Sequence, residues 1–174
     1  MPPILKPPFH IREAKEDDIP IILQLIKDLA TYEKEPESAK ATPELLKVNI
    51  FEKRHASALL AFTGTTSNPG EAVGLALYFF NFSTWTGRPG LYLEDLFVSE
   101  QYRKFGIGKA FFGALAKIAQ ENNCARMDWA VLKWNTPSIE FYEKVLGAKG
   151  MDEWEGMRLE EAGIEALKKF SLRD

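Results

Sequence analysis

The stretch RKFGIGKAFF, residues 103–112, places two cations and two glycines ahead of a run of apolar residues. These apolar residues continue at the spacing of one helical face for three turns: Ile107, Ala110, Phe111, Ala114, Leu115, Ile118 and Ala119. Just before the stretch, GLYLEDLFV (residues 90–98) has the composition of a strand. The sequence therefore predicts a strand, a turn and a helix in succession. The glycines need a reason, because glycine destabilises a helix interior by about 1 kcal/mol relative to alanine.

Predicted helices and strands surround this unit on both sides. A strand at 9–13 precedes a helix that Asp17 or Asp18 caps and whose apolar face comprises Ile19, Ile22, Leu23, Ile26, Leu29 and Ala30. The other predicted elements are a helix at 42–53, strands at 57–63, 72–82 and 125–132, a helix within 135–147, a possible strand at 154–161 and a closing helix at 160–171. Early hairpins and late β-α-β connections predict an α/β fold with a mixed, mostly antiparallel sheet flanked by helices.

Length, charge and cysteine content narrow the class of protein. The 174 residues suit a single domain, which we place at 9–174 after a proline-rich tail at 1–8. A net charge of −3 argues against a general nucleic-acid binder. The longest apolar run, AVGLALYFF, is too short to span a membrane, and no signal peptide is evident. Cys124 is the only cysteine, so we expect a reducing compartment, the cytoplasm.

The glycine stretch suits the binding of a phosphate or pyrophosphate. The first N–H groups of a helix have no partner within the helix, and with the helix dipole they attract an anion. Gly106 and Gly108 remove side chains that would block a close approach, and Arg103, Lys104 and Lys109 add positive charge. The alternative is that the glycines only permit a tight turn, because G-x-G alone is a weak motif.

Two common phosphate-binding motifs are excluded. A P-loop needs G-x-x-x-x-G-K-[ST], but Arg103 stands at its first glycine and Ala110 follows Lys109. A dinucleotide fingerprint needs glycine or alanine at position 111, which is Phe111. What remains is R-x-x-G-x-G directly after a strand.

In this motif and context the chain resembles the Gcn5-related N-acetyltransferase (GNAT) superfamily. The resemblance extends over REAKEDDIPIILQLIKDLATYEK, YLEDLFVSEQYRKFGIG, AVLKWNTPSIEFYEKVLGA and EGMRL, which are similar to its diamine and thialysine branch. That branch usually has glycine after the arginine, where this chain has Lys104. The resemblance implies a GNAT fold, acetyl-CoA as co-substrate without a metal, and an acetyl group moved to a primary amine through a tetrahedral intermediate.

Such a reaction needs a route for the proton of the amine and a proton donor near the departing sulfur. Glu94 is our candidate for the first role, because a partly buried carboxylate has a raised pKa; a structural ion pair or hydrogen bond is the alternative. Asp95 should point to the opposite face of the strand. Tyr142 is the candidate donor by the resemblance, although a tyrosine on a helix more often packs in a core.

The resemblance also implies the residues that bind the coenzyme and the amine. The backbone of Leu96, Phe97 and Val98 would pair with the pantetheine arm. The expected pyrophosphate and further coenzyme contacts are Arg103, Lys104, Phe105, Gly106, Ile107, Gly108, Lys109, Asn135, Thr136, Pro137 and Ser138. Asn135 is equally a helix cap. The expected acceptor residues are Tyr32, Glu33, Glu94 and Trp85, with Trp85 alternatively in the core.

The acceptor amine is narrowed by one absent carboxylate. Members that prefer polyamines carry aspartate where this chain has Ser83, and STWTGR and AVLKWN are closer to thialysine-type members. A substrate of that type carries a carboxylate, toward which Arg88 could contribute. The family resemblance also implies a homodimer. Two alternatives stay open, namely a coenzyme A-binding module without turnover and a protein acetyltransferase acting on lysine side chains or N-termini.

Overall fold

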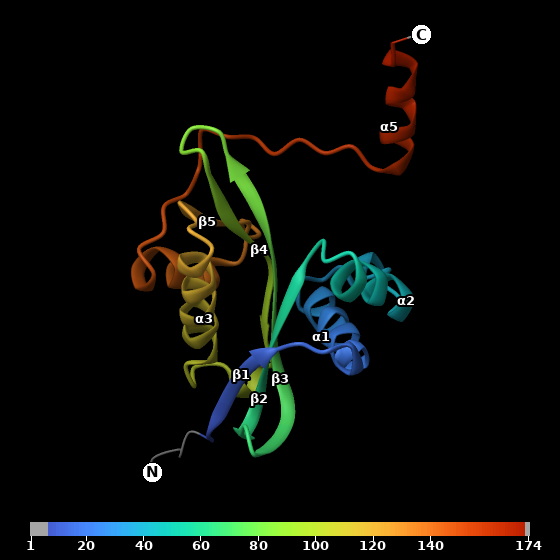
Figure 1. Ribbon diagram of the computed structural model, residues 1–174. Helices are drawn as coiled ribbons and strands as arrows, with labels where there is room; N and C mark the ends of the chain where they lie inside the picture. The colour runs from blue at the N-terminus through green and yellow to red at the C-terminus, as the bar shows by residue number, and fades with distance from the viewer. Residues whose placement is uncertain (1–6, 173–174) are drawn as a thin grey trace. The chain divides into compact units, whose positions relative to one another are not determined.

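The computed structural model describes residues 7–172 (Figure 1). The chain divides into two compact units, one ending at Ala130 and the other beginning at Val131. Most of the predicted tail at 1–8 lies outside the described residues. Within residues 7–172, every helix falls short of the length and apolar character that a membrane span requires.

The first unit is built on a five-stranded sheet with the order β1-β2-β3-β4-β5. The strands are β1 (Phe9–Glu13), β2 (Ser57–Thr65), β3 (Asn68–Ser83), β4 (Arg88–Val98) and β5 (Arg126–Trp129). Successive strands from β1 to β4 pair antiparallel, and only β5 runs parallel to its neighbour β4. A parallel connection needs a crossover, and α3 (Ile107–Glu121) supplies it. The predicted mixed, mostly antiparallel sheet is confirmed.

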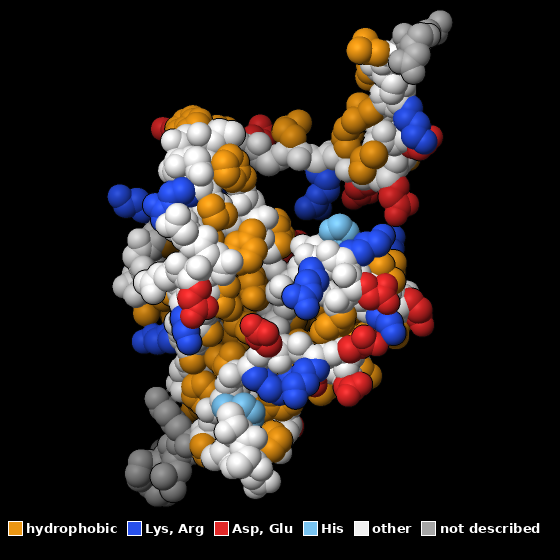
Figure 2. Space-filling model, in the orientation of Figure 1, with side chains coloured by type: hydrophobic (Ala, Val, Ile, Leu, Met, Phe, Trp, Pro, Cys, Tyr) orange, Lys and Arg blue, Asp and Glu red, His pale blue; other side chains and the backbone are white. Residues whose placement is uncertain are grey.

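Helices cover both faces of this sheet, with α1 and α2 on one side and α3 on the other (Figure 1). The first side carries η1 (Glu16–Asp18), α1 (Ile19–Tyr32), η2 (Pro36–Ser38), α2 (Pro43–Leu46) and the π-helical turn η3 (Lys47–Glu52). Charged side chains of both signs intermingle on the outer surface of this region (Figure 2). The sheet is therefore shielded from water on both sides, as its apolar strands require.

The buried face of α1 differs slightly from the predicted one. Ile19, Ile22, Leu25 and Leu29 are buried, whereas the predicted Leu23 and Ile26 are half-buried. They pack with the inward side chains of the sheet, including Leu60, Leu75, Leu77 and Phe97. Asp18 precedes α1 but does not cap it through its side chain. Its carboxylate instead accepts hydrogen bonds from Arg12 at 2.6 and 2.9 Å, which hold its pKa below the ordinary value.

The second unit contains α4 (Thr136–Glu140), the π-helical turn η5 (Phe141–Val145), α5 (Glu161–Ala166) and η6 (Leu167–Phe170). Asn135 caps α4 as expected, with its side-chain oxygen accepting from the Ser138 N–H. The predicted strand at 154–161 is wrong, since residues 154–160 are irregular and α5 begins at Glu161. A strand forms only when a neighbour pairs with its backbone, and no described residue pairs with this segment.

Candidate active site

The β4 strand loses one neighbour halfway along its length. Its pairing with β5 covers only Gly90–Leu93, whereas its pairing with β3 continues to Val98. On the β5 side, residues 94–98 therefore have no paired strand among the described residues of the first unit. Main-chain groups on such an edge can accept an extended ligand as an added strand. Leu96, Phe97 and Val98 lie on this edge, and the Phe97 ring is buried in the core, so its backbone is the available part.

A β-bulge at Glu94 marks the start of this unpaired edge. Leu93 pairs with Tyr78 and Asp95 pairs with Leu77, so Glu94 is the extra residue. A bulge breaks the alternation of side chains along a strand, and the two carboxylates lie close enough for the Glu94 charge to act on Asp95. The side chain of Glu94 is exposed rather than partly buried.

Asp95 has a strongly perturbed acidity. Burial, followed by the charges of Glu94 and Glu33, raises the pKa of Asp95 from 3.8 to about 6. Glu33 itself follows the last turn of α1, and burial raises the pKa of its carboxyl. The structure thus brings together three carboxylates from α1 and β4, two of which the sequence had singled out. Such a cluster attracts a cation, because a nearby positive charge offsets the repulsion between the carboxylates.

The predicted phosphate turn separates the roles of its two glycines. Gly106 is the residue before α3 and has a φ of 97°, a left-handed conformation that glycine adopts without strain. Gly108 lies inside the first turn of α3, where its φ is not left-handed. A Cβ atom at position 108 would meet no protein atom within 4 Å. Turn geometry therefore accounts for Gly106, but neither geometry nor packing accounts for Gly108, and open space remains above the helix start.

Arg103 is turned away from this helix start, toward α1 and the end of β4. Its Nε donates a hydrogen bond to the Val98 carbonyl at 2.9 Å, and its guanidinium carbon lies 4.4 Å from the centre of the Tyr32 ring. The same carbon lies 5.9 Å from the centre of the Phe97 ring. The positive charge expected beside the helix start is therefore that of Lys104 and Lys109, which are exposed. Arg103 instead joins the turn to the predicted acceptor residue Tyr32.

The turn between β3 and β4 carries the remaining acceptor candidates. Trp85 is 88% exposed, so the core alternative is wrong for this residue. Arg88 donates hydrogen bonds to the carbonyls of Asn123 and Cys124 and to the Asn123 side chain, so its guanidinium is already engaged by the chain itself. Ser83 is buried, with 5% exposure.

Tyr142 and the Asn135–Ser138 segment belong to the second unit. Asn135 is 7% exposed and caps α4, and Thr136 and Pro137 open the helix. Tyr142 lies in η5, directly after α4, and its ring packs against that of Phe141 at 5.6 Å between centres. The Tyr142 side chain is half-buried.

Known proteins are similar to this chain in sequence and in fold. The model of the acetyltransferase (GNAT) family matches residues 22–148. A thialysine N-epsilon-acetyltransferase of Mus musculus is 40% identical, over 94% of this chain and 98% of that protein. One of Bos taurus is 39% identical, over 92% and 96%. An integron cassette protein from the mobile metagenome of V. cholerae has a TM-score of 0.75 and 27% identity, over 92% of this chain and 98% of its own.

The chain belongs to the acetyltransferase (GNAT) family. Within that class it is an N-acetyltransferase, an acyl-transferring enzyme whose family uses acetyl-CoA as co-substrate.

Sequence reasoning missed the perturbed acidity of Asp95. Its signal was present, because two adjacent acidic residues inside an apolar strand are costly to bury together. A regular strand would have separated them, and only the bulge unites them with Glu33.

Proposed function

We propose that the enzyme transfers the acetyl group of acetyl-CoA to the primary amine of a small lysine-like amino acid, of the thialysine type, or of a diamine or polyamine. The observation that carries this proposal is the carboxylate cluster at the start of the unpaired β4 edge. Groups that attract an ammonium lie there beside main-chain groups suited to an extended thioester arm.

The residues of the first unit fit acetyl-CoA in two respects. The unpaired edge at Leu96–Val98 offers backbone groups to the pantetheine arm, and the open space at Gly108 admits a pyrophosphate against the first N–H groups of α3. Lys104 and Lys109 would add charge to that contact, while Phe105, Gly106 and Ile107 shape it. When bound, acetyl-CoA supplies the activated acetyl group. On the second unit, Asn135–Ser138 would contact the coenzyme, a role that rests on the family resemblance.

The carboxylate cluster would bind the amine and remove its proton. An alkyl ammonium with a pKa of about 10.4 is almost wholly protonated at neutral pH and cannot attack a carbonyl. We assign Glu94 as the proton acceptor, directly or through water, with Asp95 beside it. The pKa of this neighbouring Asp95 is raised to about 6, mainly by burial. Glu33 and Tyr32 would line the amine site, and the exposed Trp85 would wall it.

Tyr142 would protonate the departing sulfur. This role follows from the family resemblance and from the position of the residue on the helix that Asn135 begins. A positioned tyrosine hydroxyl can donate its proton as the carbon–sulfur bond breaks, so that the sulfur leaves as a thiol and not as a thiolate.

The choice among amines favours the lysine-like class. The two relatives above are named thialysine N-epsilon-acetyltransferases. The position where polyamine-preferring members carry aspartate is Ser83 in this chain, and it is buried.

We further propose that residues 9–174 act as one domain, in a homodimer and in the cytoplasm. Light scattering tests the dimer, and tagging with microscopy tests the compartment.

The decisive experiment measures coenzyme A release from acetyl-CoA with thialysine, lysine, putrescine and spermidine, each against a blank without amine. We expect the largest amine-dependent release with thialysine. Coenzyme binding without release on any amine would instead identify a binding module. Acetylation seen only on a lysine peptide, by intact mass, would identify a protein acetyltransferase.

A further inference from the structure

A second group of charged side chains lies on the same side of the sheet as the carboxylate cluster. Gly90 of β4 pairs with Asn81 of β3 on one side and with Arg126 of β5 on the other. Asn81 lies four residues along β3 from Leu77, whose side chain belongs to the core beneath α1 and which pairs with Asp95. Directly paired residues, and residues two or four apart along a strand, point to the same face. Arg126 and Asp95 therefore share the α1 side of the sheet.

The side chain of Arg126 leans across β4. A Cβ atom at Gly90 would lie 3.0 Å from the Arg126 Cγ and 3.2 Å from its Nε, so the arginine occupies room that only glycine leaves. The Nε also lies 2.9 Å from Asp128 Oδ2 in an ion pair, and both side chains are partly exposed, at 45% and 37%. The Nη groups of Arg126 donate to no described residue. Arg126 and Asp128 thus present a cation and an anion side by side above β4.

Two aromatic rings cover the sheet between this ion pair and the carboxylate cluster. Phe79 and Tyr92 are paired residues on the same face, two positions along from Asn81 and Gly90, and their rings stack with centres 5.0 Å apart. Both side chains are half-buried, and this part of the β3–β4 hairpin extends beyond α1 and α2 (Figure 1). Aromatic rings make favourable contacts with a thioether and with methylene groups. The floor therefore suits the side chain of a lysine-like amino acid.

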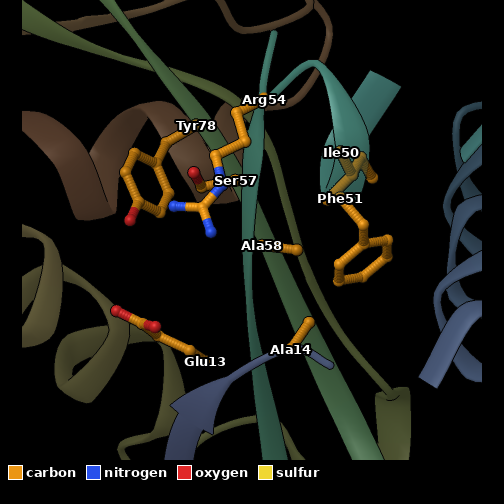
Figure 3. A pocket seen from close by; sticks show the side chains of 8 residues that line it. All are labelled: Glu13, Ala14, Ile50, Phe51, Arg54, Ser57, Ala58 and Tyr78. Atoms are coloured by element: carbon orange, nitrogen blue, oxygen red, sulfur yellow. The ribbon is translucent and has the colours of Figure 1, made fainter. Parts of the chain in front are cut away.

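The other arginines described in the first unit are committed elsewhere. Three of them are bound by the chain itself, namely Arg12 by Asp18, Arg88 by the carbonyls of Asn123 and Cys124, and Arg103 by the Val98 carbonyl. The fourth, Arg54, lines a pocket in which Figure 3 shows its guanidinium beside Ser57 and Tyr78. Tyr78 follows Leu77 along β3, so its side chain points away from the α1 side. Among these five arginines, Arg126 is the one with a guanidinium available beside the carboxylate cluster.

We propose that Arg126 and Asp128 bind the α-amino-acid head of a lysine-like acceptor, an inference that rests on the proposed function. The Nη groups of Arg126 donate to the α-carboxylate, and Asp128 accepts from the α-ammonium. The acceptor side chain crosses Phe79 and Tyr92, and its terminal amine reaches Glu94. A diamine has no carboxylate for Arg126 and its second ammonium is repelled by the guanidinium, so the pair selects amino acids over diamines.

The length of the strand agrees with such an acceptor. Four residues separate Gly90 from Glu94, a span of roughly 13 Å at about 3.3 Å per residue. The carboxylate and the terminal amine of an extended lysine-like chain are on the order of 7–8 Å apart, because six bonds of about 1.5 Å follow a zigzag. A hydrogen bond of about 3 Å at each end brings the total to about 13–14 Å.

The test compares acetyl transfer to thialysine with transfer to bis(2-aminoethyl) sulfide, the same chain without the carboxylate. Coenzyme A release gives kcat/KM for both amines in the wild-type enzyme and in Arg126→Gln. We expect the thialysine-to-sulfide ratio of kcat/KM to fall at least about tenfold in the variant, chiefly through a higher KM for thialysine. The sulfide also reports on folding, because a misfolded variant loses both activities.

Two further variants complete the test. Arg54→Gln, on the other side of the sheet, should leave the ratio unchanged. Asp128→Asn should weaken thialysine at least about threefold relative to 3-(2-aminoethylsulfanyl)propanoate, which lacks the α-amine, and this variant carries the test if Arg126→Gln does not fold. A ratio that stays constant in Arg126→Gln, or that falls equally in Arg54→Gln, overturns this inference alone. Absence of amine-dependent release by the wild-type enzyme overturns the proposed function, and this inference with it.

Discussion

The bulge at Glu94 begins the unpaired edge of β4, and the turn at residues 103–108 follows the end of that strand. The two regions differ in the sign of the charge that they attract. At the bulge, burial and then the carboxylates of Glu94 and Glu33 raise the pKa of Asp95, so the bulge is a place for a cation. The turn exposes the N–H end of α3 beneath open space at Gly108, so it is a place for an anion. Side chains create the first site and the main chain creates the second.

Arg103 shows why the two regions must be compared together. By sequence it belongs to the turn, yet its guanidinium lies over Tyr32 and bonds to the Val98 carbonyl. Arg103 therefore belongs by sequence to the anion-binding turn, but its contacts join the end of α1 to the end of β4, next to the carboxylate cluster. The comparison predicts that chemistry and coenzyme binding can be damaged separately.

The largest effect should come from a residue outside both regions. Tyr142→Phe removes the hydroxyl that we assign as proton donor, so kcat should fall by roughly 10²–10⁴-fold. Steady-state kinetics measures this fall, and the Kd of coenzyme A should stay within about twofold. Unchanged turnover would show that Tyr142 is not the proton donor, and the donor would then have to be sought among the residues of the first unit.

A substitution at the Glu94 bulge should lower the rate of acetyl transfer and leave coenzyme binding unchanged. Glu94→Gln removes the proposed proton acceptor, so kcat at neutral pH should fall by roughly 100-fold while the coenzyme A Kd stays constant. Glu44→Gln, an exposed glutamate at the start of α2, is the matched control for the loss of charge. If both variants lose activity equally, the effect is one of overall charge and the bulge has no special role.

The glycine turn should affect binding alone. Gly108→Val fills the open space above the helix start, so the coenzyme A Kd should rise by about tenfold or more, measured by calorimetry. Gly113→Val is the matched control, because Gly113 lies in the same helix and a Cβ there also meets no atom within 4 Å. Equal weakening in the two variants would reduce the turn to a matter of helix stability.

The smallest effect concerns stability and the acidity of Asp95. A pKa raised from 3.8 to about 6 means that the folded protein favours the protonated form, so this contribution to stability is full below pH 3.8 and is lost as the pH rises through 6. Asp95→Asn stays neutral, so its Tm advantage should grow across that range to several °C, at roughly 2–4 °C for each kcal/mol. Thermal melts at several pH values measure it, with Asp152→Asn as control. A Tm difference that does not change with pH would contradict the raised pKa of Asp95.

The order of elements followed from local pattern. Apolar spacing located α1 and α3, and the Asn-Thr-Pro sequence located the start of α4. The segment 154–161 shows the limit of this reasoning, because its alternation resembles a strand but no neighbour pairs with it. A helix carries its hydrogen bonds within itself, whereas a strand depends on a partner that may be distant in sequence.

The sequence by itself predicted the mixed sheet and the glycine turn after β4, because periodicity and residue type are local properties. The candidate residues Glu33 and Glu94 came with the family resemblance. Only the tertiary structure decided that β4 outruns β5, that the bulge unites Asp95 with Glu94 and Glu33, and that Arg103 turns back to Tyr32. The physical reason is that strand register, burial and the pKa of a carboxyl all depend on neighbours that folding brings from elsewhere in the chain.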